Sequence, residues 1–167
     1  MRLTLAFILS IIFAVGLVAF GFTFYQSSTE RNKLISELEI RTGQVAKDIL
    51  QTDTLFFKQI NQQNIERFAD SIAKQHNLLG IAVYYNNDSI LSNNSTQSLI
   101  YHSINFISQS ITADSSLGNF FKINGEKIYQ FIKPVKLPDR SNCAVIFYID
   151  AGYIDKVIGS IWFGNFI

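Results

Sequence analysis

The chain opens with an uninterrupted apolar run, and this run limits its possible folds more than any other feature. No charge interrupts LTLAFILSIIFAVGLVAFGFTFY from Leu3 to Tyr25, and the nearest charged residues are Arg2 and Glu30. A helix needs roughly 20 mainly apolar residues to cross the hydrocarbon core of a bilayer. The run therefore predicts a transmembrane anchor over residues 1–25, with the rest of the chain tethered to the lipid bilayer.

A cleaved signal peptide is the competing interpretation of this run. Such a peptide has an apolar core of roughly 7–15 residues followed by a small-x-small cleavage site. The tripeptide Ala19-Phe20-Gly21 matches that site, but the apolar run continues beyond it to Tyr25. This greater length favours an anchor that stays in the membrane.

The charges of the chain exclude one partner class and leave the membrane orientation open. The net charge is +1 and no Lys/Arg run is present, so the chain lacks the electrostatic footprint of a nucleic-acid-binding protein. Arg2 is the one basic side chain before the apolar run, whereas Arg31, Lys33 and Arg41 follow it. Taken alone, this excess of basic residues after the anchor favours a cytoplasmic domain. Large domains translocate largely regardless of charge, so the orientation has to be inferred from the type of domain that follows the anchor.

Residues 26–78 are predicted to form a helical stalk followed by a second helix. The stalk carries apolar residues at heptad spacing, with threonines in the remaining positions: Ile35, Leu38, Thr42, Val45, Ile49, Thr52 and Phe56. This narrow stripe fits either the seam of a homodimeric coiled coil or packing on the domain's own sheet. A second amphipathic helix is expected from Asn64 to Gln75.

Residues 79–150 are predicted to form an antiparallel sheet with a helix inserted from Gln97 to Ile111. Asn124-Gly125 is the strongest hairpin signal, because both residue types tolerate positive φ. Turns are also expected at residues 86–88 and 138–142, and Pro134 indicates an edge position or a bulge. The five expected strands are Leu79–Tyr85, Ser89–Ser92, Asn119–Ile123, Lys127–Leu137 and Cys143–Asp150. The fold class is therefore α+β.

Residues 151–167 are predicted to form a C-terminal helix. The helical segment, from Tyr153 to Ile167, is apolar but too short to span a bilayer. It either caps the sheet or begins a second membrane helix, with Trp162 at the membrane interface.

Catalytic and metal-binding patterns are missing from the sequence. His76 and His102 are the only histidines, and neither has a Cys, Asp or Glu neighbour at metal-ligand spacing. There is no glycine-rich phosphate loop and no nucleophile elbow. The lone Cys143 lies in an apolar run and is expected to be a buried small side chain. We therefore expect no enzyme activity, no metal and no cofactor.

A binding site is more consistent with the aromatic residues of the predicted sheet. Alternation along the long strand places Tyr129, Phe131 and Lys133 on one face, which would offer a phenol and a cation to an anionic or hydroxylated ligand. Ordinary core packing is the competing interpretation of such an aromatic stripe. Tyr84 and Tyr148 join the expected ligand-binding set if their strands are neighbours of the long strand, and Tyr101 and His102 close it from the inserted helix.

The order of elements resembles the extracytoplasmic PAS-like or single-Cache sensor modules of bacterial membrane signalling proteins. Residues 79–91 (LGIAVYYNNDSIL) are similar to the hairpin that opens such sheets, and residues 145–154 to the exit into a second membrane helix. Residues 1–8 and 38–46 are similar to the N-terminal membrane-sensor region of some bacterial trehalose-phosphate synthases.

The resemblance implies a membrane-anchored sensory input domain for signal transduction, without its own output domain. It implies a single pass through the inner membrane at the N-terminus and a domain facing the periplasm or the exterior, with a small-molecule ligand. Two alternatives remain. One is a bitopic structural or assembly scaffold of the envelope, and the other is the regulatory membrane region of a carbohydrate enzyme whose catalytic domain is absent.

Overall fold

The chain forms two compact units in the computed structural model, which describes residues 2–52, 62–85, 89–92, 96–100, 104–136 and 142–166. One unit comprises Met1–Glu37 and Tyr153–Ile167, and the other comprises Leu38–Gly152. Helix α1 (Arg2–Thr52) is a single helix of 51 residues that belongs to both units. The predicted anchor and stalk are thus one continuous helix.

The first unit pairs the apolar part of α1 with α5 (Gly152–Phe166). Among the described residues, α1 is the one helix long and apolar enough to cross a membrane. Its apolar side chains point outward, as Phe13 illustrates with 69% of its surface exposed. Such an all-apolar exposed surface is typical of a helix surrounded by lipid.

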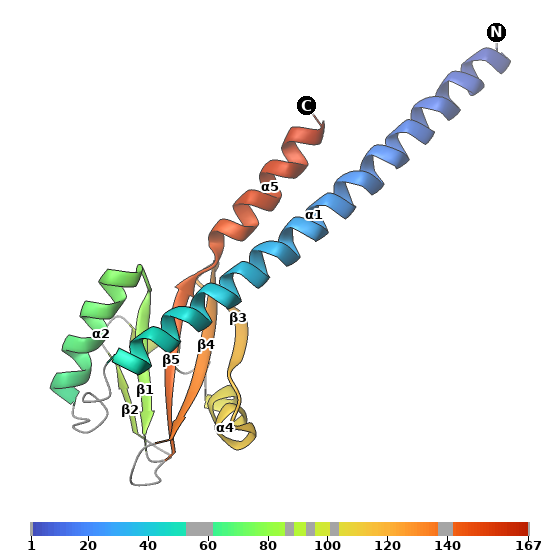
Figure 1. Cartoon of the computed structure of the whole chain (residues 1–167). Coiled ribbons are helices and arrows are strands. Elements are labelled where there is room, and N and C mark those ends of the chain that lie inside the picture. The colour runs from blue at the N-terminus through green and yellow to red at the C-terminus, as the bar shows by residue number, and fades with distance from the viewer. Residues whose placement is uncertain are drawn as a thin grey trace. The chain divides into compact units, whose positions relative to one another are not determined.

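Polar contacts join α5 to α1 inside the first unit. The indole Nε1 of Trp162 donates a hydrogen bond to Ser27 Oγ at 3.2 Å, and Asn165 Nδ2 donates to Thr23 Oγ1 at 3.2 Å. The ring of Trp162 also lies 5.6 Å from that of Phe20. Residue numbers rise along α5 as they fall along α1, so the two helices are antiparallel (Figure 1). These contacts bury the hydroxyls of α1 among otherwise exposed apolar residues.

The second unit is built on an antiparallel five-stranded sheet of order β2-β1-β5-β4-β3. Strand β5 lies at the centre and pairs with β1 on one side and β4 on the other. The mixed helix-and-sheet class is as predicted. The strands are β1 (Gly80–Tyr85), β2 (Ser89–Ser92), β3 (Leu117–Ile123), β4 (Glu126–Lys136) and β5 (Asn142–Asp150).

Local sequence signals account for the ends of several elements. Asn124 and Gly125 have φ values of 51° and 86°, which confirms the predicted hairpin between β3 and β4. Beyond Ile132, β4 pairs with β5 but no longer with β3, so Pro134 lies at a sheet edge where its missing N–H costs no ladder bond. The second predicted helix is α2 (Gln62–His76).

The helix predicted from Gln97 to Ile111 is observed on both sides of residues 101–103. The described parts are α3 (Gln97–Ile100) and α4 (Ile104–Ala113). Several predictions lie outside the described residues: Phe56, the turn at residues 86–88, most of the turn at residues 138–142, and the side chains of Tyr101 and His102.

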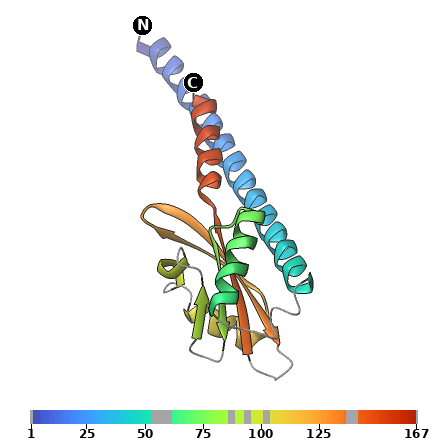
Figure 2. The same ribbon diagram turned by 90° about the vertical axis from the view of Figure 1, so that its left-hand side faces the viewer.

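The C-terminal part of α1 and α2 cover one face of the sheet, which we call the stalk face (Figures 1 and 2). Ala46 and Ile49 of α1 and Ala69 of α2 pack there against buried residues of the two central strands, Ile81, Val83, Cys143, Val145 and Phe147. Ile49 of the apolar stripe is therefore buried against the domain's own sheet, with Val45 partly buried beside it. These two residues favour packing on the sheet, and the homodimer through the stalk stays a prediction.

Helices α3 and α4 cover the opposite face, which we call the α4 face. Leu99 and Ile100 of α3 and Ile107 of α4 pack on alternate residues of the central strands: Ala82, Tyr84, Ile128, Ile132, Ala144, Ile146 and Tyr148. The sheet is thus buried on both sides, which explains why β1 and β5 are apolar at nearly every position.

Candidate functional site

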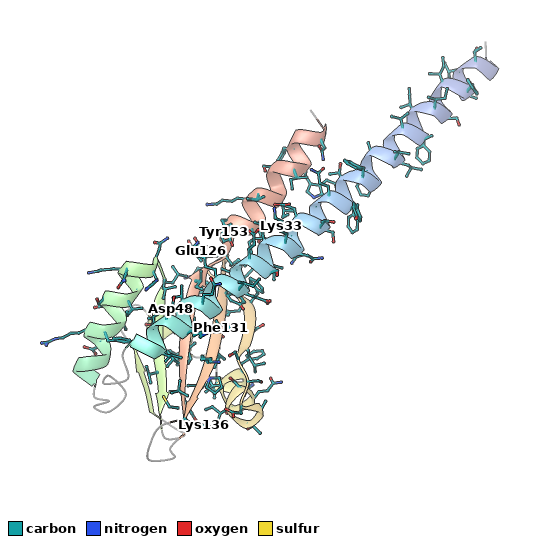
Figure 3. All side chains as sticks on the ribbon, viewed as in Figure 1. Lys33, Asp48, Glu126, Phe131, Lys136 and Tyr153 are labelled. Carbon is teal, nitrogen blue, oxygen red and sulfur yellow. The ribbon has the colours of Figure 1, made fainter. Side chains whose placement is uncertain are left out.

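The stalk face holds three of the residues that the sequence assigned to a binding site. Tyr129, Phe131 and Lys133 do share this face, as strand alternation predicted. Tyr129 is only 1% exposed, and the centre of the Phe131 ring lies 6.4 Å from that of Phe147, with the two rings tilted. A Cβ added at Gly43 of α1 would lie 4.0 Å from the ring of Phe131, so α1 is in contact with this side chain (Figure 3). These aromatic side chains are core residues beneath α1.

The predicted set does not come together as one site. Tyr129 and Phe131 are opposite Ile149 and Phe147 on β5, so Tyr148 between them points to the α4 face. Tyr84 is opposite Ala144 and lies on that face too. The predicted grouping of these tyrosines with Tyr129 is wrong, because the observed register between the strands places them on opposite faces of the sheet.

Tyr129 is enclosed by a small cluster on the stalk face. Its ring lies 4.8 Å from that of Phe120, and Lys127 Nζ lies 5.5 Å from the Phe120 ring centre. A Cβ added at Gly118 would overlap the Tyr129 hydroxyl, so only glycine leaves room for it. Burial, and then the negative charge of Glu39, raises the pKa of the Tyr129 phenol well above its usual range.

This raised pKa predicts a loss of stability in alkali. In the unfolded chain the Tyr129 phenol ionises at about pH 10, whereas in the folded chain it keeps its proton to higher pH. Tyr129 therefore stabilises the fold fully below about pH 10, and above it the free energy of unfolding falls by up to about 1.4 kcal/mol per pH unit. Urea unfolding followed by circular dichroism between about pH 8 and about pH 11 should show a shallower fall for Tyr129→Phe. The more exposed Tyr153 offers the control, and an equal change in Tyr153→Phe would contradict the assignment.

The α4 face carries a row of polar side chains across the sheet. Gln130 of β4 is opposite Asn119 of β3 on one side and Tyr148 of β5 on the other. Tyr148 is opposite Gly80 of β1, and Thr96, just before α3, occupies the space that a side chain at Gly80 would fill. We call Asn119, Gln130, Tyr148 and Thr96 the polar row.

Apolar side chains flank the polar row on the same face. Ile132 and Ile146 lie next to it in one direction along the strands, and Ile128 and Phe121 in the other. The Phe121 ring meets the Tyr148 ring edge-on at a centroid distance of 6.4 Å. A few polar groups within apolar walls are the usual composition of a small-molecule site.

Gln130 is the feature of this row that most needs an explanation. Its residue is 0% exposed, and neither its side-chain oxygen nor its nitrogen has a hydrogen-bond partner in the described part of the chain. Leaving a buried amide unpaired costs about 1–3 kcal/mol, so such groups in folded proteins are rare. An amide without a partner among the described residues, at the centre of a polar row, makes this row the candidate binding site.

The sequence contained a weak signal for this residue. Gln130 lies between Ile128 and Ile132 at the same alternation, so a polar side chain interrupts an apolar face. That face could not be identified as a site from the strand alone, because its cover and its strand neighbours depend on the topology. No group of three or more His, Cys, Asp or Glu that could hold a metal occurs among the residues the structure describes.

Sequence comparisons give no relatives, since no family model matches and no curated protein matches. Comparison with solved structures finds similar domains. The sensory domain of the Campylobacter jejuni chemoreceptor Tlp3 with isoleucine bound aligns with a TM-score of 0.61 at 8% identity, over 79% of this chain and 59% of that one. The ligand-binding domain of Tlp3 in complex with 4-methylisoleucine aligns with a TM-score of 0.51 at 12% identity, over 83% and 62%.

These similarities concern the fold. A second structure of the Tlp3 sensory domain aligns with a TM-score of 0.60 at 8% identity, over 78% of this chain and 60% of that one. The chain thus spans about three fifths of the length of these domains. The expected sensor-type fold is confirmed: the chain has the fold of chemoreceptor sensory domains.

Proposed function

We propose that this chain is a membrane-anchored sensory input domain that binds a small molecule on its α4 face. The apolar part of α1 supports an anchor in the inner membrane, and the fold supports a non-catalytic domain on the outer side of that membrane. The observation that carries the binding role is the unpaired, fully buried amide of Gln130 at the centre of the polar row.

The connection between β5 and α5 supports a signalling role for the same site. Tyr148 of the polar row lies on β5, and Ala151 follows this strand and leads into α5. Ala151 N donates a hydrogen bond to Lys127 O at 2.9 Å, and Gly152 N donates to Asp150 Oδ1 at 2.7 Å. The first bond holds the end of β5 to β4 and the second fixes the turn into α5, so a change in the pairing of these strands reaches the start of α5. A ligand shifts such an equilibrium only by its differential affinity for the two states.

A thermal-shift screen of the full chain in lipid nanodiscs tests the proposed function. The only cysteine, Cys143, is 1% exposed in β5, so a thiol-reactive fluorogenic dye reports the unfolding of the second unit. A compound that binds the folded domain should raise the melting midpoint with concentration, by about 5 °C at roughly ten times its Kd. A metabolite library without any such compound would contradict the proposal and favour an envelope scaffold.

A further inference from the structure

We infer that the polar row recognises an uncharged ligand bearing a carboxamide-type group, such as a primary amide, a lactam or a urea. This inference rests on the proposed ligand-binding function and adds the chemical class of the ligand. It follows from the hydrogen-bonding pattern of Gln130 and from the distribution of charge on the α4 face.

The hydrogen-bonding pattern of the Gln130 side chain is complementary to an amide-type group. A glutamine side chain offers one acceptor oxygen beside an NH₂ donor, and both of these atoms of Gln130 are buried without a partner among the described residues. The complementary group presents a donor beside an acceptor, as an amide, lactam or urea does. A carboxylate accepts from the NH₂ group but has no proton for the oxygen, so half of the side chain would stay unpaired.

The other members of the row are consistent with this pattern. Asn119, Tyr148 and Thr96 are neutral, and the side chains beside them are aliphatic or aromatic. The row therefore favours a ligand with one amide end and an otherwise apolar body.

The charge distribution on the described part of the α4 face comes second. Its charged residues lie at the ends of the strands, with Glu126 and Asp150 near one end and Lys136 at the other. Lys136 is paired with Asp114, the residue directly after α4. The nearest of these groups along the strands is Asp150, which is exposed and two residues beyond Tyr148.

A charged ligand would therefore be poorly matched. A carboxylate beside Gln130 would be desolvated without a counter-charge and would be repelled by Asp150. An ammonium group beside Gln130 could pair with the amide oxygen but would leave the NH₂ group without an acceptor. The face thus discriminates against both signs of charge at the polar row.

Pairs of isosteres that differ in this one group test the inference. We would compare isobutyramide with isobutyrate, and nicotinamide with nicotinate, on the full chain in nanodiscs with the Cys143 dye. The expected result is a concentration-dependent rise in the melting midpoint with the amides, of about 5 °C near saturation, and no rise with the carboxylates. A rise of similar or larger size with the carboxylates would overturn the inference while leaving the proposed binding function in place.

Variants at position 130 assign the effect to the side chain. Gln130→Met keeps the length of the side chain and removes the unpaired amide, so the ligand-free midpoint should rise and the amide-dependent shift should vanish. Val135→Ala, on the stalk face of the same strand, is the matched control and should keep the amide-dependent shift. If Gln130→Met folds poorly, Gln130→Leu serves the same purpose.

Two further outcomes decide against the inference. An amide-dependent shift that persists in Gln130→Met would place the ligand away from the polar row. A stabilised Gln130→Met in a protein that responds to neither amides nor carboxylates would mean that Gln130 has only a water partner. If no compound of the metabolite library raises the melting midpoint either, the proposed function fails together with the inference.

Discussion

Replacing Gly80 with alanine is expected to lower the free energy of unfolding of the second unit by about 2–3 kcal/mol. A Cβ at Gly80 would overlap Thr96 Cγ2 and would lie 3.1 Å from Thr96 Oγ1 and 3.2 Å from its Cβ. Thr96 is 0% exposed, so its side chain cannot relieve the overlap by turning into solvent. The methyl group therefore has to push the start of α3 away from β1, which loosens the packing of Leu99 and Ile100 on the α4 face.

A second substitution at the contact shows whether the overlap is the cause. Thr96→Ser removes Cγ2 but keeps the hydroxyl, so the double variant Gly80→Ala, Thr96→Ser should regain most of the lost stability. Melting midpoints from the Cys143 dye for the two single variants and the double variant form a double-mutant cycle. Additive losses would contradict the close approach of Thr96 to β1. Because Thr96 belongs to the polar row, Gly80→Ala should also weaken any ligand-dependent shift.

Replacing Phe147 with alanine is expected to cost about 3–5 kcal/mol, the largest single loss in the molecule. Phe147 is 0% exposed on the central strand, opposite Ile81 on β1 and Phe131 on β4. It lies in the cluster that includes Ala46 of α1 and Ala69 of α2. The change would leave a cavity at the point where the sheet meets both helices.

The measurement for Phe147→Ala is the free energy of unfolding from urea titration, followed by circular dichroism. A loss this large leaves little of the 5–15 kcal/mol that typically stabilises a domain, so a large unfolded fraction is expected at 37 °C. Phe163→Ala is the control, because Phe163 is 73% exposed and should change stability by less than about 0.5 kcal/mol. A small loss at Phe147 would show that α1 does not close the stalk face.

The two variants separate the two faces of the sheet. Phe147→Ala should reduce stability while the folded fraction still responds to ligand, because the polar row points the other way. Gly80→Ala should reduce both stability and response. Adjacent positions on β5, Phe147 and Tyr148, thus belong to different layers with different roles.

Much of the secondary structure was predictable because its causes are local. The apolar run before Gln26 predicts a helix long enough to cross a membrane, and the pattern around Tyr129 predicts a strand. Asn124-Gly125 turns the chain wherever two strands flank it, since both residues accept positive φ. The predicted ends of the strands agree with the observed ones to within two residues, and the small differences arise because terminal residues respond to tertiary contacts as much as to propensity.

The candidate site was not predictable from the same patterns. Alternation correctly grouped Tyr129, Phe131 and Lys133, yet it could not say that α1 covers their face. It also could not place Tyr84 and Tyr148, because the register between β1, β5 and β4 depends on pairing between strands far apart in the sequence.

Local sequence, then, decides which segments are helical or extended and which of their residues lie on the same side, since these properties depend on neighbours along the chain. Only the folded sheet decides which side α1 covers, and only it brings Asn119, Gln130, Tyr148 and Thr96 into one row. It alone leaves the Gln130 amide without a partner among the described residues. Hydrogen-bond satisfaction depends on atoms brought together by strand pairing and by the docking of α3 and α4, which no single segment specifies.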